Sequence, residues 1–235
     1  TRKESSAASD VYKRQPLSLG ATIACPAQST LTDPSRLASW LQQHGVSVIH
    51  LTPPLGKLIE TGAHLNGQVL DHLRYLFWGG DALSPTQYQQ VRAIAPNAVN
   101  VNFYGTTETP QAMAFHTLDP EMDNARVPLG KGIADAQLLV INPANQLVSE
   151  GETGEILIRS PYLSRGYWGD PGLTEAKFIA NPFTADAADR CYRTGDLGTY
   201  LADGSASFLG RADSQVKIRG HRIELVEIET VSYTH

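Results

Sequence analysis

The sequence predicts an α/β protein in which a mostly parallel sheet is layered with helices and followed by a β-rich subdomain. Residues 16–118 alternate between short apolar runs and segments with helical spacing. Alternation of strands and helices along a chain implies a mostly parallel sheet. From about Asp119 the pattern changes to short alternating stretches separated by turn residues, which indicates a run of short strands.

Three helices are expected in the first part. The aspartate before Pro34 acts as an N-cap, the proline occupies the first turn, an apolar stripe follows, and Gly45 ends the helix. The pairs Pro53-Pro54 and Ser84-Pro85 mark two further helix starts. The strands expected between these helices cover residues 46–51, 75–78 and 99–103.

Two of these strands are followed by dipeptides that contain glycine. Gly79-Gly80 follows the second strand, and Tyr104-Gly105 follows the third. Ligands on parallel sheets bind beyond the carboxyl ends of the strands. Both dipeptides are therefore expected to belong to one binding site.

The β-rich part is predicted from four alternating stretches and one turn signal. Asp203-Gly204 lies between the last two stretches and is typical of a hairpin. The four predicted strands cover residues 137–141, 155–158, 198–201 and 205–209.

Composition excludes several function classes. The 235 residues are 41% hydrophobic, which allows one large core or two smaller ones. The net charge is −5, from 19 Lys and Arg against 24 Asp and Glu, and nucleic-acid binders are usually basic. Since no apolar run reaches the ~18–20 residues that a membrane helix needs, no membrane partner is expected either.

The two cysteines, Cys25 and Cys191, are too few for a disulfide framework or a four-thiolate metal site. Both are expected to be packed thiols in a reducing cytoplasm.

The two ends of the chain are expected to be non-native. Residues 10–15, D-V-Y-K-R-Q, resemble the translation of a sequencing adapter, and residues 231–235, V-S-Y-T-H, resemble that of its reverse complement. Native sequence is therefore expected from about Pro16 to Thr230. A natural disordered N-terminus is the alternative, because residues 1–9 are rich in serine and alanine.

The most informative stretch is 210–225, G-R-A-D-S-Q-V-K-I-R-G-H-R-I-E-L. Four cations accompany a short apolar alternation, and a different apolar spacing begins at Ile223. This pattern predicts a basic strand, a corner at Gly220 and a following helix. An ordinary solvated edge strand is the alternative reading.

Three further motifs precede this stretch in order. Residues 102–108 read N-F-Y-G-T-T-E, residues 151–167 read G-E-T-G-E-I-L-I-R-S-P-Y-L-S-R-G-Y with L-G-K-G before them at 129–132, and residues 192–197 read Y-R-T-G-D-L. Together the motifs resemble those of the adenylation domains of nonribosomal peptide synthetases, which are adenylate-forming enzymes like acyl-CoA ligases and luciferases.

The resemblance implies a ligase that activates a carboxylic acid, foremost an amino acid, with ATP and Mg²⁺ to an acyl-adenylate. A phosphopantetheine thiol on a carrier domain then accepts the acyl group. Carrier and condensation domains are the implied partners in the full-length chain. The implied domains are an α/β part of the large N-terminal subdomain at 16–118, a β-rich subdomain at 119–210, and a hinge with the start of a small C-terminal α+β domain at 211–230.

The resemblance also implies a nucleotide site. Tyr104 would offer its ring to adenine, Asn102 would hydrogen-bond the base edge, and Asp196 would accept from both ribose hydroxyls. Without the motif, Asp196 reads as a turn cap. The full implied set is Gly80, Asp81, Asn102, Tyr104, Gly105, Thr107, Asp196, Phe208 and Arg211.

Three residues are implied as catalytic and one as a hinge. Thr107 would donate to the α-phosphate, and Glu108 would bind Mg²⁺, a hard cation that prefers oxygen ligands. Lys217 would act in the thiol step after a rotation about Asp213. Without its motif, Glu108 reads as solvated surface.

The implied substrate pocket has apolar walls and one amide, which favours a modest or apolar side chain. Its residues are Leu51, Phe77, Gly79, Phe103, Gln111 and Ala112.

The chain departs from the family pattern at Thr106, where proline is usual, and this form is more similar to aminoadipate-reductase-type domains. The family's glycine-rich phosphate loop is expected before this chain and its catalytic lysine after it, so the piece alone is expected to be inactive. The alternatives are an acyl-CoA or aryl-CoA ligase, and a non-catalytic nucleotide-binding or carrier-docking module.

Overall fold

The computed structural model describes residues 16–109, 112–121, 126–213, 216–218 and 221–223. The chain divides into two compact units. Unit 1 comprises Thr1–Leu51, Leu55–Phe77 and Thr86–Asn100, and unit 2 comprises Thr52–Pro54, Trp78–Pro85 and Val101–His235. The expected adapter-derived tails, 1–15 and 231–235, lie outside the described residues.

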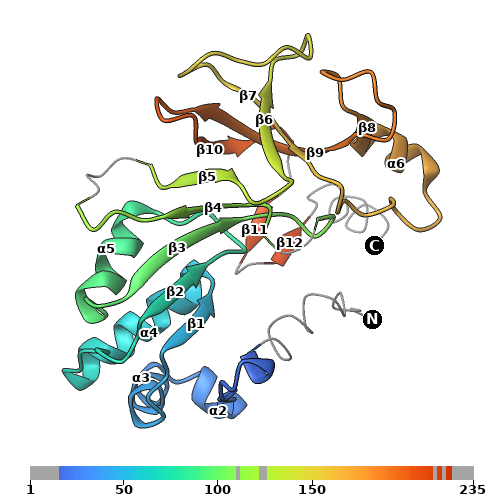
Figure 1. Ribbon diagram of the computed structural model, residues 1–235. Coiled ribbons are helices and arrows are strands. Elements are labelled where there is room, and N and C mark those ends of the chain that lie inside the picture. The colour runs from blue at the N-terminus through green and yellow to red at the C-terminus, as the bar shows by residue number, and fades with distance from the viewer. Residues whose placement is uncertain (1–15, 110–111, 122–125, 214–215, 219–220, 224–235) are drawn as a thin grey trace, which may run out of the picture. The chain divides into compact units, whose positions relative to one another are not determined.

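Unit 1 is the helical unit (Figure 1). Apart from a few terminal residues that belong to unit 2, it holds α2 (Gln28–Leu31), α3 (Pro34–Gln43), β1 (Val48–Leu51), α4 (Pro53–Asn66), β2 (Tyr75–Trp78) and α5 (Pro85–Ile94).

Helix α3 shows how local sequence sets an element. The Asp33 side chain caps the helix by accepting from the Arg36 amide at 3.1 Å, and Pro34 occupies the first turn, as predicted. At Gly62 of α4, a Cβ atom would lie 1.9 Å from the carbonyl oxygen of Pro34. Only glycine therefore permits this approach of α4 to α3.

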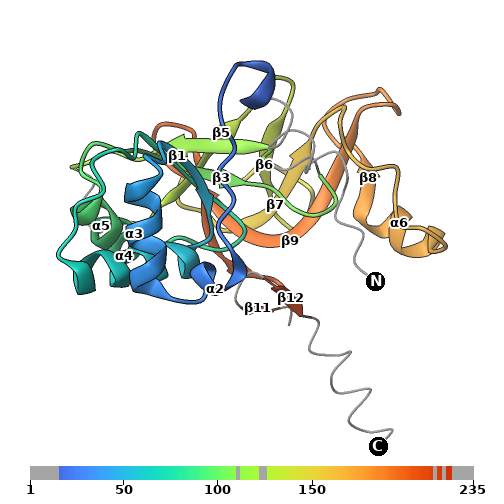
Figure 2. The same cartoon turned by 90° about the horizontal axis from the view of Figure 1, so that it is seen from below.

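Unit 2 is built almost entirely from strands (Figures 1 and 2). Its elements are β3 (Val99–Tyr104, of which the first two residues belong to unit 1), β4 (Ala114–Thr117), β5 (Pro128–Gly132), β6 (Gln137–Ile141), β7 (Gly154–Arg159), α6 (Pro171–Lys177), β8 (Phe178–Ala180), β9 (Arg190–Tyr200), β10 (Ala206–Arg211), β11 (Val216–Ile218) and β12 (His221–Ile223).

The strands of unit 2 follow the order β3-β4-β5-β10-β9-β7-β6, and β8 also pairs with β9. The ladders described between these strands are antiparallel. Strands β11 and β12 form a separate hairpin. The α/β fold class is confirmed: among the described residues, ten strands belong to a mixed sheet and are accompanied by helices.

Strand β9 is longer than the sequence predicted, because it begins at Arg190 and already contains the T-G-D motif. The central residue of that motif, Gly195, has a φ of +73°, which an L side chain rarely adopts. Its neighbour Thr194 donates from Oγ1 to the carbonyl of Ile156 on β7 at 2.6 Å. The motif is therefore a distorted stretch inside a strand and not a turn.

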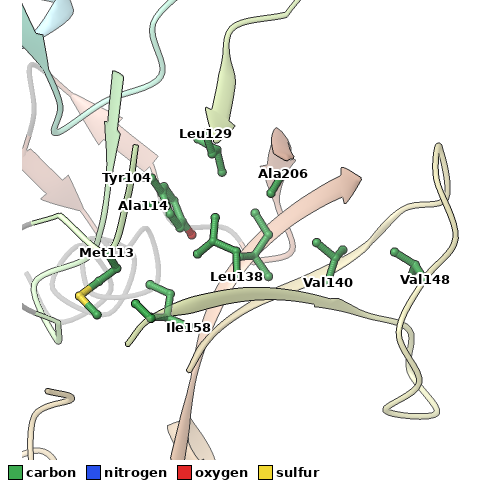
Figure 3. Packing of buried hydrophobic residues seen from close by; sticks show 11 residues of the cluster. Tyr104, Met113, Ala114, Leu129, Leu138, Val140, Val148, Ile158 and Ala206 are labelled. Atoms are coloured by element: carbon green, nitrogen blue, oxygen red, sulfur yellow. The ribbon is translucent and has the colours of Figure 1, made fainter. Parts of the chain in front are cut away.

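The core of unit 2 lies between the strands of the β-rich part (Figure 3). Leu138 of β6 lies beside its register partner Ile158 of β7, Val140 lies further along β6, and Tyr104 joins the cluster from β3. At Gly130 of β5, a Cβ atom would lie 1.8 Å from the carbonyl oxygen of Phe115, so β4 and β5 approach too closely for any side chain.

The basic segment near the C-terminus corrects one prediction. Val216–Ile218 form a strand, as expected, but His221–Ile223 form a second strand that pairs with it. The helix predicted to begin with Ile223 therefore does not begin there, because the backbone of these residues pairs with β11. Gly220, the predicted corner, lies outside the described residues. Within the described ranges, no helix is long and apolar enough to cross a membrane.

The two cysteines differ from each other. Cys191 is completely buried in β9, as expected, but the expectation is wrong for Cys25, which is exposed. Cys25 lies in a segment of unit 1 where few side chains are covered. Burial raises the pKa of the Cys191 thiol to about 11.

Alkylation of the native chain at pH 8 is expected to modify Cys25 and to spare Cys191. The thiolate is the reactive form, and both burial and the raised pKa of Cys191 suppress it. Mass spectrometry after brief iodoacetamide treatment should show one label, which Cys25→Ser removes. Two labels on the native chain would contradict the packing of Cys191.

Candidate functional site

A cavity of about 340 Å³ lies in unit 2. Its walls come from the turn after β2, the end of β3, the segment leading into β5, and strands β9 and β10. Eight of the nine residues implied for nucleotide binding line it: Gly80, Asp81, Asn102, Tyr104, Gly105, Asp196, Phe208 and Arg211.

Asp196 of β9 is the most constrained of these residues. Its side chain is buried, and each carboxylate oxygen accepts a hydrogen bond. Tyr104 Oη donates to Oδ2 at 2.7 Å, and Arg211 Nη1 donates to Oδ1 at 2.7 Å. The turn-cap reading of Asp196 is therefore wrong. A carboxylate has about four acceptor positions, so Asp196 retains capacity to accept from a ligand.

Tyr104 joins the core to the cavity. Burial raises the pKa of its phenol well above the usual value, and the charge of Asp196 and the hydrogen bond to it act in the same direction. The phenol therefore stays protonated at neutral pH and remains a donor to Asp196. Its ring belongs to the core cluster and also lines the cavity.

Arg211 links Asp196 to the predicted hinge. Its guanidinium donates from Nη1 to the Thr194 carbonyl at 2.9 Å, and from Nε and Nη2 to the two oxygens of Asp213 at 2.9 and 2.5 Å. Burial alone would lower the pKa of Arg211, but the hydrogen bonds to Asp213 and Asp196 outweigh it and raise that pKa. Asp196, which is predicted to bind the ribose, and Asp213, the predicted hinge residue, are thus both paired with Arg211.

Asn102 and the turn at Gly80 also form part of the wall. Asn102 is buried, and its Nδ2 donates to the carbonyl of Pro128 at 2.8 Å, which fixes the amide orientation. Gly80 has a φ of +84°, and a Cβ atom there would lie 3.3 Å from Thr52. The turn is therefore a site where only glycine fits the backbone without strain.

Thr107 and Glu108 follow β3 but do not line this cavity. Thr107 is exposed, whereas Glu108 is buried, so the reading of Glu108 as solvated surface is wrong. The Thr109 hydroxyl closes this turn by accepting from the Thr106 amide at 3.0 Å and donating to the Thr106 carbonyl at 3.1 Å. Glu108 Oε1 accepts from Tyr167 Oη at 2.8 Å.

The described residues contain no group of three or more metal-ligating side chains. Mg²⁺ typically takes only one or two carboxylates from a protein and completes its shell with phosphates and water. A single buried carboxylate such as that of Glu108 therefore fits a magnesium ion that arrives with a nucleotide.

The residues implied for the substrate pocket are divided between the two units. In unit 2, a Cβ atom at Gly79 would lie 3.8 Å from the Cβ of Phe103, and Phe103 lines the cavity. Ala112 is half-buried. In unit 1, Leu51 is buried, and Phe77 stacks on His50 with ring centroids 4.8 Å apart. Gln111 lies outside the described residues.

The predicted residues of the C-terminal segment are described to different degrees. Asp213 is exposed and is paired with Arg211. Lys217 lies in β11, opposite Arg222, and its side chain lies outside the described part of the chain.

Sequence reasoning missed several members of the site. The cavity wall also contains Leu83, Arg126, Val127 and Leu129, and Tyr167 contacts Glu108. Leu129 opens the L-G-K-G motif and Tyr167 ends the motif at 151–167, so both carried a signal. The other three belong to none of the motifs.

Known proteins are similar to this chain over most of its length. The family model described as "AMP-binding enzyme" matches residues 14–168. L-2-aminoadipate reductase of Saccharomyces cerevisiae is 38% identical over an alignment of 245 residues. The alignment covers 92% of this chain and 17% of that protein. Gramicidin S synthase 2 of Brevibacillus brevis is 38% identical over 216 residues, covering 92% of this chain and 5% of the synthase. The chain therefore spans a small part of these relatives.

Solved structures show the same fold. The structure of PA1221, described as an NRPS protein containing adenylation and PCP domains, superposes with a TM-score of 0.75 at 31% identity, covering 85% of this chain and 40% of that one. IdnL1 superposes with a TM-score of 0.79 at 28% identity, covering 89% of this chain and 43% of that one.

Tyr104→Phe is expected to lower the free energy of unfolding of the chain by about 1.5–3 kcal/mol, since it removes a donor to a buried carboxylate. Urea denaturation measures this loss. In an Asp196→Asn background the same change should cost less, because the acceptor is no longer charged. Equal losses in both backgrounds would show that the phenol does not stabilise the carboxylate.

Proposed function

Because this chain belongs to the AMP-binding enzyme family, we propose that it is part of an adenylation domain of the peptide-synthetase type. The domain would activate an amino acid with ATP to an acyl-adenylate for transfer to a phosphopantetheine thiol. The observation that carries the proposal is the cavity of unit 2, which is lined by the turn at Gly80 and by Asp196, held between Tyr104 and Arg211.

The chemistry requires that a carboxylate attack the α-phosphate of ATP and that pyrophosphate leave. Such phosphoryl chemistry depends on positioning and charge neutralisation rather than on covalent help from the protein. In the proposed site, Asp196 accepts from the ribose hydroxyls, the Tyr104 ring lies beside the base, and Arg211 contributes positive charge near the ribose and phosphate.

Glu108 and Thr107 are assigned to the phosphate end. Glu108 would hold Mg²⁺, which neutralises phosphate charge when bound, and the exposed hydroxyl of Thr107 would donate to the α-phosphate. Asn102, Gly80, Asp81, Gly105 and Phe208 would complete the wall around the nucleoside.

An amino acid is the proposed acid because gramicidin S synthase 2 and a plipastatin synthase of Bacillus subtilis are 38% and 35% identical to this chain. The residues proposed for the side-chain pocket include Gly79, Phe103 and Ala112 of unit 2. Apolar walls with one amide favour a modest or apolar side chain.

A parent of the aminoadipate-reductase type is a second candidate. Thr106 stands where the family has proline, and five L-2-aminoadipate reductases are 36–38% identical to this chain. Such a parent would select L-2-aminoadipate, so the acid that drives adenylation separates the two candidates.

The thiol step and its partners belong to the same proposal. Asp213 would be the hinge about which the small domain turns, and Lys217 would enter the site for the thiol step. A carrier domain and a condensation domain would lie in the same full-length chain; one of the superposed structures, PA1221, is described as an NRPS protein containing adenylation and PCP domains. The proposed location is the cytoplasm.

The first test is substrate-dependent exchange of pyrophosphate into ATP, measured on the full-length protein that carries this chain. One amino acid is expected to drive exchange, and Glu108→Ala is expected to reduce the rate at least 10-fold, since it removes a ligand of the metal. Exchange driven only by fatty or aryl acids would place the protein among CoA ligases. AMP binding without exchange for any acid would leave a non-catalytic module.

The second test concerns the hinge. Proline fixes φ near −65°, so Asp213→Pro should block rotation there and slow thioester formation far more than adenylation. Asp213→Ala is the matched control, because it also removes the pair with Arg211 but leaves the backbone free. Single-turnover assays measure the two half-reactions. Equal slowing of both by Asp213→Pro would contradict a hinge at this position.

A further inference from the structure

Glu108 is held by a side chain from a distant part of the sequence. Tyr167 lies 59 residues later, in the loop between β7 and α6, and its Oη donates to Glu108 Oε1 at 2.8 Å. The same loop reaches the Glu108 backbone, because the Ser164 amide donates to the Glu108 carbonyl at 3.2 Å. The residue proposed to bind the metal is thus contacted by this loop twice.

The backbone of Tyr167 is itself fixed. Its amide donates to Thr174 Oγ1 at 2.9 Å, and that hydroxyl donates to the Asp170 carbonyl at 2.8 Å. The preceding Gly166 has a φ of +143°, and a Cβ atom there would lie 2.3 Å from Thr174. The loop therefore packs directly against the first turns of α6 and cannot shift freely.

The ring of Tyr167 is also held in place. It packs edge-on against Phe178 of β8, with ring centroids 5.7 Å apart and planes at 63°. Phe178 in turn packs against Tyr192 of β9, at 5.0 Å between centroids. Aromatic pairs in this geometry fix ring orientation, so the phenol of Tyr167 points at Glu108 from a rigid base.

A second phenol continues the chain of hydrogen bonds. Tyr192 Oη lies 3.4 Å from Tyr167 Oη. Because Tyr167 donates its single proton to Glu108, Tyr192 is the donor in this contact. Burial raises the pKa of Tyr192 far above its usual value, and the hydrogen bond with Tyr167 and the charge of Glu108 add to this effect. Tyr192 therefore stays protonated at neutral pH.

We propose that Tyr167 is a positioning residue that orients the Glu108 carboxylate for Mg²⁺. This inference rests on the proposed function of Glu108 and adds a residue to it. A carboxylate that accepts a hydrogen bond from a phenol retains lone pairs for a cation, and the bond removes the freedom to turn away from it. Residues that orient metal ligands in this way typically contribute about 10–100-fold to metal affinity or activity.

The test uses the full-length protein with Tyr167→Phe, which keeps the ring and removes only the hydroxyl. Two quantities are measured: the affinity for Mn²⁺ in the presence of a non-hydrolysable ATP analogue, by electron paramagnetic resonance, and the Mg²⁺ concentration that half-saturates exchange. Both midpoints are expected to rise about 10-fold. The affinity for AMP in EDTA is expected to stay unchanged, because Tyr167 does not line the nucleoside cavity.

Tyr162→Phe is the matched control. Tyr162 lies in the same loop, is exposed, and has its Oη 3.5 Å from Asp135, so its loss should leave both metal midpoints unchanged. A partly unfolded sample would reduce the number of active sites, but it would not shift the midpoint of those that remain. The readout therefore separates positioning from stability.

Glu108→Ala separates this inference from the proposed function. If Glu108→Ala weakens metal binding and Tyr167→Phe matches the wild type, the positioning role is wrong while the assignment of Glu108 stands. If Glu108→Ala leaves the Mn²⁺ affinity unchanged, both assignments fail. A parallel loss of metal and AMP affinity in Tyr167→Phe would also overturn the inference, since it would indicate a general structural effect.

Discussion

The candidate site of unit 2 depends on one buried charge, the carboxylate of Asp196. Burying a carboxylate is costly unless it is paired and hydrogen-bonded. Tyr104 and Arg211 meet that requirement, one at each oxygen. Because these partners come from β3 and β10, the carboxylate connects strands that are 92 and 15 residues away in sequence. The cavity wall is therefore fixed by electrostatics as well as by the apolar core behind it.

Arg211 also connects the nucleoside cavity to the predicted hinge at Asp213. Its guanidinium joins Asp196, which is buried, to Asp213, which is exposed at the start of the basic segment. The rigid fork of arginine allows one side chain to serve both carboxylates, which lysine could not do. The predicted hinge is thus tied to the wall of the nucleoside cavity. A rotation about the φ angle of Asp213 would move its side chain and break the Arg211–Asp213 pair, while the pair with Asp196 could persist.

Much of this architecture could be predicted from the sequence. The cap and first-turn proline at Asp33-Pro34 predicted α3, and the apolar run at 75–78 predicted β2, because both signals are local. Eight of the nine residues that the resemblance implied for nucleotide binding line one cavity. The length of β9 was not predicted, since Gly195 interrupts the alternation and its pairing with β7 is non-local. The strand at His221–Ile223 was mistaken for a helix start because three residues carry no distinguishing period.

The contacts of Glu108 explain why the remaining part of the site could not be predicted from the sequence. Nothing in the residues near 108 indicates that a tyrosine 59 positions later will hold this carboxylate. Asp196 and Glu108 are nevertheless held in the same way. Each carboxylate is buried, and each accepts a hydrogen bond from a buried or half-buried tyrosine. Burial raises the pKa of the Tyr104 phenol, so it remains a donor to Asp196 across the neutral range. A histidine in its place would change charge near pH 6.5 and make the carboxylate position depend on pH. A neutral phenol instead holds Glu108 without neutralising it, which leaves its negative charge for a metal ion, whereas the charge of Asp196 is also paired with Arg211.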